Sequence, residues 1–314
     1  MPYTPPIPQH PGLTRLTDID LRTIVPYIHW TFFFAAWRIT GRFEGIETAC
    51  DCASCRMGWL MKLPENERPK AEEALKLFQD AQELLRNYAG DGSLRVNASV
   101  GIYPCRSVAD DIVLEHDGGE VLLPTLRQQT PSNDGYCYAL SDFISPLSDY
   151  VGVFVTSVTG AEEAAALFEK DDDIYRSILV KTLADRLAEA SAEWLHYKVR
   201  KEIWGYSPDE AEDVKSMFKC AYRGIRPAVG YPSLPDQSVI FELGKVIDFE
   251  QTGVTLTENG AMYPNASVCG IYFAHPAAKY FNVGKIDKRQ LTSYAARRGK
   301  TVEEMKKWLA ANLE

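Results

Sequence analysis

Hydrophobic residues recur along this chain with two spacings, one typical of helices and one typical of strands. Between residues 69 and 90 an apolar stripe has the three- and four-residue spacing of a helix, which begins at Pro69 and ends near Gly90. A longer stripe from 173 to 204, closed by Gly205, has the same spacing and is expected to form the spine of the fold. The apolar positions of this second stripe are Ile178, Leu179, Leu183, Leu187, Ala190, Trp194 and Leu195.

Strands are expected where apolar residues alternate with polar or small ones. The alternation is regular from Val96 to Ile102, as in a strand with one buried face. Further along, Asp117-Gly118-Gly119 separates two short apolar runs, and this sequence predicts a hairpin. The expected strands are 96–102, 112–114, 121–123, 150–158, 268–273 and 280–286.

Shorter helices are expected towards both ends of the chain. Residues 1–16 are predicted to form an extended arm, after which 17–20 cap a first helix. Another helix is expected at 238–246, and the tail ends in two helices, the second opened by Thr301 and Glu304 as a capping box. Helices and strands follow one another without a regular strand-helix-strand order. This pattern predicts an α+β fold with an antiparallel sheet.

The composition is ordinary for a globular protein. Of the 314 residues, 46% are hydrophobic and 25% are charged, so a core of useful size can form. Because no stretch rich in proline, glycine or serine divides the chain, we expect a single domain over residues 17–314. The formal net charge of −9 and the lack of a clustered basic segment argue against a nucleic-acid partner.

The sequence has no segment typical of a membrane span or an export signal. The apolar run at 28–37 is too short for a span and is broken by His29 and Thr31. The N-terminus contains several prolines and lacks both the basic start and the apolar stretch of a signal peptide. We therefore expect a cytoplasmic protein with no membrane partner.

Three of the seven cysteines lie close together as Cys-x-Cys-x-x-Cys, formed by Cys50, Cys52 and Cys55. Thiolates at this spacing can converge on a zinc ion or an iron–sulfur cluster. A structural zinc site usually has four ligands, however, and no second Cys-x-x-Cys follows. Two interpretations stay open: a metal or cluster site, and three reduced thiols on an exposed turn.

The segment 223–232, Arg-Gly-Ile-Arg-Pro-Ala-Val-Gly-Tyr-Pro, combines charge, glycine and proline in one loop. Arg226 precedes a proline, which pushes its backbone towards an extended conformation, and Gly230 can adopt angles closed to other residues. A guanidinium in such a loop can bind a carboxylate with two parallel hydrogen bonds. The segment therefore indicates a rigid cationic recognition loop for a small ligand. The alternative is an ordinary surface turn with a salt-bridged arginine.

Several short stretches occur in the order expected of one known family. They are Gly-Ile-Tyr-Pro at 101–104, Asp-Asp-Ile at 110–112, Leu-Arg-Gln-Gln-Thr at 126–130, Asp-Phe at 142–143, Val-Lys-Thr-Leu-Ala-Asp-Arg-Leu-Ala-Glu-Ala at 180–190, Trp-Gly-Tyr at 204–206, Ala-Met-Tyr-Pro at 261–264 and His-Pro at 275–276. With them, from about residue 27 to residue 313, the chain resembles the activation domain of cobalamin-dependent methionine synthase, which binds S-adenosylmethionine. So many ordered matches are more specific than any one motif. The resemblance implies a bent antiparallel sheet flanked by helices, and it gives no role to residues 48–67, which look like an insertion.

The resemblance implies a binding site for S-adenosylmethionine built around the loop. Arg226 would bind the methionyl carboxylate, while the backbone near Ala228 and the ring of Tyr231 would contact the nucleoside. Tyr280 and Phe281 stand where the family has a ligand-contacting aromatic pair. Because they are expected on a strand, their side chains would point to opposite faces, and Tyr280 is the one expected to reach the ligand.

Three further positions bear on this site. Glu189 stands where the resemblance implies an acidic residue near the ligand, and the alternative is a solvated helical glutamate paired with Arg186. His29 and Cys220 stand where the family has acidic residues. A neutral histidine can accept a hydrogen bond but cannot balance a positive charge as a carboxylate does. The alternative for His29 is a polar residue satisfied within a half-buried helix.

The resemblance also implies a role in reactivating cobalamin that has been converted to its inactive cobalt(II) form. S-adenosylmethionine would supply a methyl group, and the chain would contribute by positioning it rather than by moving a proton. The cobalamin would be carried by a partner in trans, either a methionine synthase core or another corrinoid protein. A flavodoxin-like protein would supply the electron. No catalytic side chain is expected on this chain.

Two other functions stay open. One is a redox activator of a corrinoid protein, in which Cys50, Cys52 and Cys55 hold an iron–sulfur centre. The other is a non-catalytic binding module that has kept the fold and lost the ligand through His29 and Cys220. The sequence has neither the Gly-x-Gly-x-x-Gly turn of the common nucleotide-binding fold nor the Gly-x-Ser-x-Gly of hydrolases, so those classes are not indicated.

Overall fold

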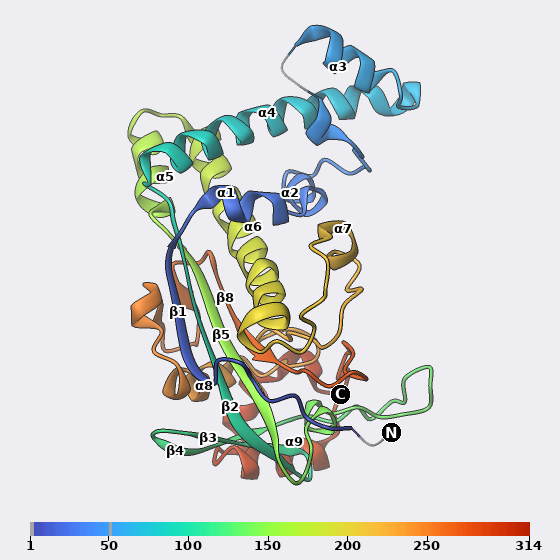
Figure 1. Cartoon of the computed structure of the whole chain (residues 1–314), viewed down its shortest axis with the longest axis vertical. Helices are drawn as coiled ribbons and strands as arrows, with labels where there is room; N and C mark the ends of the chain where they lie inside the picture. The colour runs from blue at the N-terminus through green and yellow to red at the C-terminus, as the bar shows by residue number, and fades with distance from the viewer. Residues whose placement is uncertain (1–2, 50–51) are drawn as a thin grey trace. The chain divides into compact units, whose positions relative to one another are not determined.

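The computed structural model describes residues 3–49 and 52–314 (Figure 1). The chain divides into two compact units. Unit 1 consists of residues 1–17, 98–157 and 192–314, and unit 2 consists of residues 18–97 and 158–191. Two compact units can belong to one domain or to two, depending on whether each unit is stable on its own. The single domain over residues 17–314 therefore stays a prediction.

The main sheet has the strand order β4–β3–β2–β5–β8, and β1 also pairs with β2. The pairs β2–β3, β3–β4 and β5–β8 are antiparallel. The α+β class with an antiparallel sheet is therefore confirmed. The strands are β1 (Gly12–Ile19), β2 (Arg95–Val108), β3 (Asp111–His116), β4 (Gly119–Pro124), β5 (Asp149–Thr159) and β8 (Ser267–Tyr272). A small second sheet pairs β6 (Thr255–Leu256) with β7 (Met262–Tyr263).

The predicted hairpin is confirmed, and one predicted strand is wrong. His116 of β3 pairs with Gly119 of β4, which leaves two residues at the turn. The segment 280–286 forms no strand, because its backbone N–H groups bond to three separate places rather than to one neighbouring strand. Phe281 donates to Ser233 Oγ at 3.1 Å, Val283 to the Pro232 carbonyl at 3.0 Å and Ile286 to the Asn312 carbonyl at 2.8 Å.

Unit 1 contains a hydrophobic core to which the sheet and several helices contribute. Alternate side chains of β3, β5 and β8 pack with side chains of α8, α9 and α10. The capping box predicted for the last of these helices is confirmed, since Thr301 and Glu304 bond to each other's backbone N–H groups. The helices of this unit are α7 (Val214–Met217), α8 (Ile240–Val246), α9 (Lys288–Arg297) and α10 (Val302–Trp308).

Unit 2 is mainly helical, and α4 is its longest complete helix. Pro69 lies in the first turn of α4, as predicted, while Gly92 rather than Gly90 closes it, with a φ of +67°. The helices α1 and α3 lie against α4, and Trp30 of α2 meets Phe78 of α4 edge to face at 4.7 Å. The helices are α1 (Leu21–Ile24), α2 (Trp30–Ala36), α3 (Ala53–Leu60), α4 (Arg68–Asp91) and α5 (Ala161–Lys170).

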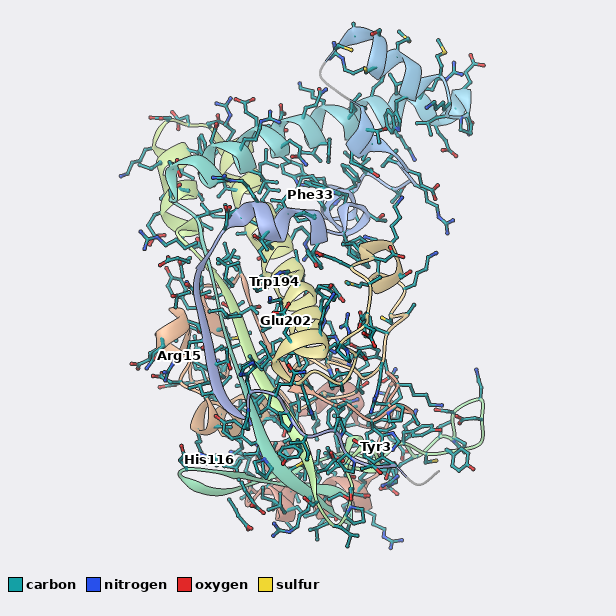
Figure 2. The ribbon with its side chains drawn as sticks, viewed as in Figure 1. Tyr3, Arg15, Phe33, His116, Trp194 and Glu202 are labelled. Carbon is teal, nitrogen blue, oxygen red and sulfur yellow. The ribbon has the colours of Figure 1, made fainter. Side chains whose placement is uncertain are left out.

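The predicted spine is α6 (Ile174–Lys198), which continues as a π-helical turn over Val199–Ile203. Trp194 and Glu202, labelled in Figure 2, mark its second half and the π-turn. Ile178 is 48% exposed, unlike the rest of the predicted stripe, yet from 187 to 200 no residue is exposed. A helix enclosed in this way can direct polar side chains into the interior. Within the described ranges, no helix is long and apolar enough to cross a membrane.

The loop 223–232 runs alongside β8 as an irregular extension of the sheet. Ile225 exchanges two backbone hydrogen bonds with Phe273, both 3.0 Å long, and Ala228 forms a bridge with Gly270. Arg226 therefore lies between two antiparallel bridges, which fix its backbone. At Gly270 a Cβ atom would lie 2.4 Å from the Pro227 carbonyl oxygen, so only glycine permits this close approach.

Replacing Gly270 by alanine is expected to lower the free energy of unfolding by about 1–3 kcal/mol, because the new Cβ would overlap backbone atoms of the loop. Gly244 in α8 is the matched control. There a Cβ would meet only the Phe249 ring, at 3.6 Å, and alanine favours a helix by about 0.5–1 kcal/mol. Denaturant titration of both variants measures the difference. Equal stabilities would contradict the close approach of the loop to β8.

Candidate functional site

A row of ionisable side chains runs along one face of α6 and its π-turn in unit 1. Glu193, His196 and Arg200 are three and four residues apart, a spacing that places them on the same face of a helix. Their exposed fractions are 7%, 0% and 0%. Burying such groups is costly unless they find partners, so the groups opposite them define a candidate site.

Arg226 of the loop is the partner of Glu193. Its Nη2 donates to Glu193 Oε2 at 2.9 Å, and the two side chains are only 16% and 9% exposed. Burial acts to lower the pKa of Arg226, but the neighbouring Glu193, together with Tyr280 and Tyr222, raises it on balance. The backbone N–H of Arg226 also donates to the Tyr280 hydroxyl at 3.0 Å. The loop thus holds a permanent cation in a largely desolvated place.

This ion pair leaves part of its hydrogen-bonding capacity unused. Glu193 Oε1 and Arg226 Nε are both buried and have no hydrogen-bond partner among the described residues. An unsatisfied buried polar atom costs about 1–3 kcal/mol. The pair therefore offers one open acceptor and one open donor, which suits a ligand that carries a group of each kind.

Aromatic rings surround the pair. The Tyr222 hydroxyl lies 3.5 Å from the Tyr280 hydroxyl, and the guanidinium of Arg200 lies 4.1 Å from the centre of the Tyr222 ring. The ring of His196 stacks on Tyr272 at 5.1 Å. We call this set the Arg226 cluster. Its members are Glu193, His196, Arg200, Tyr222, Arg226, Tyr272 and Tyr280.

The other charges of the Arg226 cluster are already balanced. Arg200 makes two parallel hydrogen bonds to Glu210, 2.8 and 2.7 Å long. Burial lowers the pKa of His196 well below its ordinary value, and the positive charges of Arg200 and Arg226 lower it further, so the ring is neutral. Two guanidinium groups are thus matched by two carboxylates. The aromatic and polar groups between them are uncharged.

Comparison with known proteins shows what kind of domain holds this cluster. The sequence model of one family, described as "Vitamin B12 dependent methionine synthase, activation domain", matches residues 20–299. The chain belongs to this family. A solved structure described as "Crystal Structure of the MetH Reactivation Domain bound to AdoHcy" is 36% identical, with a TM-score of 0.88. The alignment covers 99% of this chain and 93% of that one, so both the predicted resemblance and the predicted fold are confirmed.

The activation-domain loop and its neighbours carry five of the sequence-predicted site residues. Arg226 and Tyr280 meet in the cluster, and Tyr280 is 42% exposed. Ala228 is buried in its bridge with β8, while Tyr231 is 51% exposed. Phe281 is only 8% exposed and belongs to the core of unit 1. Tyr280 and Phe281 therefore point to opposite sides, as expected, although the segment is not a strand.

Cys220 follows α7 and is exposed. Its φ of +53° is unusual for a residue other than glycine or asparagine. Its negative charge, when ionised, would raise the pKa of Tyr280, although burial raises that pKa more strongly. Cys220 therefore lies near the cluster without being a member of it, and its role as a ligand contact stays a prediction.

His29 and Glu189 belong to unit 2. His29 precedes α2, its ring lies 4.6 Å from that of Phe32, and burial lowers its pKa. Glu189 is half-buried on α6, one turn before Glu193. Their predicted roles at the ligand stay predictions.

The predicted thiol site is only partly described. Cys50 lies outside the described residues. Cys52 caps the N-terminus of α3, where its Sγ accepts the backbone N–H of Cys55 at 3.3 Å. Within residues 3–49 and 52–314, no group of three or more His, Cys, Asp or Glu side chains is arranged to hold a metal ion. A zinc or iron–sulfur site at the three cysteines stays a prediction.

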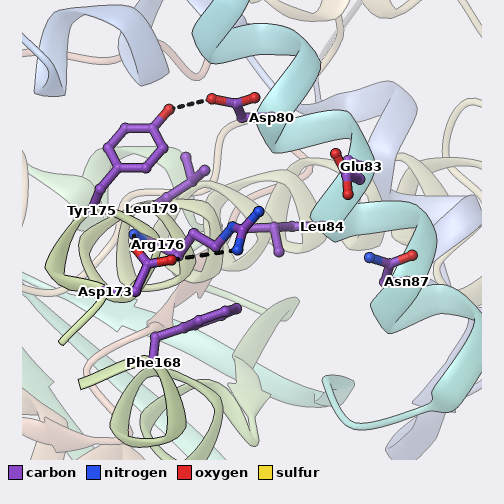
Figure 3. Close-up of a pocket in the computed structure, with 9 residues that line it drawn as sticks. All are labelled: Asp80, Glu83, Leu84, Asn87, Phe168, Asp173, Tyr175, Arg176 and Leu179. Atoms are coloured by element: carbon purple, nitrogen blue, oxygen red, sulfur yellow. Dashed lines mark hydrogen bonds and ion pairs between the residues drawn. The ribbon is translucent and has the colours of Figure 1, made fainter. Parts of the chain in front are cut away.

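Unit 2 also contains a cavity of about 500 Å³ (Figure 3). Two of its carboxylates are already engaged, Asp80 by the Tyr175 hydroxyl at 2.6 Å and Asp173 by Arg176 at 3.4 Å. None of the sequence-predicted site residues lines it. The lining residues are Asp80, Glu83, Leu84, Asn87, Phe168, Asp173, Tyr175, Arg176 and Leu179.

Most members of the Arg226 cluster were not predicted from the sequence. The missed residues are Glu193, His196, Arg200, Tyr222 and Tyr272. The first three could have been found in the sequence, because they are polar residues within an apolar helical stripe and follow one another at intervals of three and four residues. Tyr222 and Tyr272 had no such signal, since only the pairing of the loop with β8 brings them to α6.

The neutral state of His196 makes stability depend on pH. The unfolded chain binds a proton at His196 near pH 6.5, whereas the folded domain resists protonation because its pKa is lowered. The contribution of neutral His196 to the free energy of unfolding is therefore fully present above about pH 6.5. As the pH falls below this value, the free energy of unfolding decreases by up to about 1.4 kcal/mol per pH unit. Denaturant titrations between pH 7 and pH 5 measure this slope.

We expect His196→Gln to reduce that slope, and the remainder comes from His29 and His275, whose pKa values are also lowered by burial. Val199→Ala is the control, because it removes buried volume from the neighbouring π-turn without removing a titrating group. This control should lower stability at every pH and keep the slope. A His196→Gln variant with the slope of the unchanged chain would show that the ring is not held neutral.

Proposed function

We propose that this chain binds S-adenosylmethionine at the Arg226 cluster and presents its methyl group to a cobalamin carried by another protein. One support is the similar MetH reactivation domain, whose structure was solved with AdoHcy bound. AdoHcy is the compound that remains when S-adenosylmethionine gives up its methyl group. The observation that carries the proposal is Arg226 itself, a buried cation with an unused donor on a backbone fixed by β8.

Each part of the ligand has a counterpart among these residues. The guanidinium of Arg226 suits the methionyl carboxylate, because two N–H groups of a planar guanidinium can donate to the two oxygens of a planar carboxylate. Tyr231 and Tyr280 are half-exposed rings that offer flat apolar surfaces to the nucleoside. The backbone near Ala228, just before Tyr231 in the loop, would contact the nucleoside as well. Phe281, packed in the core, holds Tyr280 in place from the next position.

The proposed chemistry needs little from the protein beyond position. The reduced cobalt(I) centre attacks the methyl carbon, the bond from carbon to the sulfonium sulfur breaks, and AdoHcy is left in the site. The attacking centre supplies the electron pair of the new bond, and the electron that forms cobalt(I) comes from a flavodoxin-like donor. No proton moves, so the Arg226 cluster contributes by holding the sulfonium compound within reach of its partner.

We further propose that the partner, a methionine synthase core or another corrinoid protein, is a separate molecule in the cytoplasm. Domain contacts of this kind are modest in area and compatible with exchange of partners. The zinc or iron–sulfur centre predicted at Cys50, Cys52 and Cys55 is not required by this chemistry. Metal analysis of protein purified without oxygen tests for it independently.

Arg226→Ala is expected to weaken AdoHcy binding by about 10- to 100-fold, because hydrogen bonds to charged groups contribute about 1.5–3 kcal/mol each. Isothermal titration calorimetry measures the affinity. Arg106→Ala is the control, since Arg106 makes its ion pairs with Glu115 and Glu120 on the hairpin. The carboxylate assignment is wrong if the Arg226 and Arg106 variants bind AdoHcy equally well.

Action in trans is tested with a methionine synthase that lacks its own activation domain and has been inactivated to the cobalt(II) form. With S-adenosylmethionine and an electron donor present, adding this chain is expected to restore turnover, because the methyl donor is then held beside the cobalt. The Arg226→Ala variant should restore much less at the same ligand concentration. No recovery with the unchanged chain would contradict the proposed partner.

A further inference from the structure

We infer that Glu193 is the residue that binds the α-ammonium group of the ligand. Arg226 and Glu193 together would then bind the carboxylate and the ammonium of an amino-acid head group. The inference rests on the proposed binding of the ligand at Arg226. It concerns a residue for which neither the sequence analysis nor the proposed function requires a role. It also fixes the ligand class as compounds with an intact α-amino acid end.

The geometry at Glu193 is the first argument. Its Oε2 accepts from Arg226 Nη2 at 2.9 Å, while its Oε1 is buried and has no partner in the part of the chain that the structure describes. A carboxylate oxygen accepts hydrogen bonds only, so this open position needs a donor. On the other side of the same ion pair, Arg226 Nε is a donor without an acceptor.

The two open atoms have hydrogen-bonding characters that complement those of an α-amino acid. In such a head group a carboxylate and an ammonium are attached to the same carbon atom. A carboxylate placed at Arg226 brings the ammonium next to the group that is paired with Arg226, which is Glu193. One ligand end can thus satisfy both open atoms without breaking the ion pair.

The charge balance of the cluster favours the same ligand class. The charge of Arg200 is matched by Glu210, although Arg200 Nη1 is buried without a hydrogen-bond partner among the described residues. The pKa of His196 is lowered by burial and by both guanidinium groups, so the ring adds no charge. The cluster therefore has no surplus charge to offer. A head group with one positive and one negative charge preserves this balance, whereas a carboxylate or an ammonium alone would leave a buried charge unmatched.

The experiment compares two ligands on two proteins. The ligands are AdoHcy and the analogue made from 4-sulfanylbutanoate, which lacks only the α-amino group. The proteins are the unchanged chain and Glu193→Gln. For AdoHcy the substitution is expected to weaken binding by about 10- to 100-fold, because a charged hydrogen bond is lost. For the analogue the substitution should not weaken binding, because no ammonium is present to lose a hydrogen bond and the ligand carboxylate then matches Arg226 alone.

Glu202→Gln is the matched control. Glu202 lies on the π-turn that continues α6, is exposed and pairs with Lys198, so the same substitution there should leave both affinities unchanged. Circular dichroism and thermal melting check that each variant is folded. Should Glu193→Gln not fold, the unchanged chain still carries the test, because its affinity for AdoHcy must exceed its affinity for the analogue by a similar factor.

Three results would overturn the inference. An equal loss of affinity for both ligands would mean that Glu193 acts only by positioning Arg226. Tighter binding of AdoHcy to Glu193→Gln would mean that Glu193 occupies the carboxylate position and must be displaced. Equal affinity of the unchanged chain for both ligands would show that the ammonium is not recognised. A failure of the unchanged chain to bind AdoHcy at all would instead refute the proposed function, and the inference would fall with it.

Discussion

The ion pair between Arg226 and Glu193 is the interaction on which the rest of the site depends. Removing both groups from water is expensive, and a buried ion pair often stabilises a fold no more than apolar residues would. Its value is therefore better sought in function. The pair joins a loop residue to a residue 33 positions earlier on α6, and it keeps one donor and one acceptor open. When the charged groups of a site are already ordered and removed from water, ligand binding costs less free energy for desolvation and ordering.

The surrounding structure holds the loop residue of this pair by backbone bridges to β8 and by the Tyr280 hydroxyl, which accepts the Arg226 N–H. The loop pairs with β8 on both sides of Arg226, and Gly270 allows the two backbones to approach. The π-turn after α6 places Arg200 in the interior, where Glu210 neutralises it. π-helical turns are frequent at functional sites because they shift the register of side chains within a helix.

The sequence predicts the parts of the site that are local and misses those that are not. The loop was recognisable because proline fixes its own φ and glycine permits backbone angles closed to other residues. The start of α4 at Pro69 and the hairpin at Gly118 were predictable for the same two reasons. Glu193 was missed, because only the folded chain shows that it pairs with Arg226 of the loop. The segment 280–286 was misread because alternate burial of Tyr280 and Phe281 also arises in an extended segment that has no neighbouring strand.

The most direct test of this account is a crystal structure of the chain with AdoHcy bound. The account predicts the ligand carboxylate within about 3 Å of the Arg226 guanidinium, and the α-ammonium within the same distance of Glu193 Oε1. AdoHcy bound at another place, with Arg226 still engaged by Glu193 alone and Nε unmatched, would contradict it.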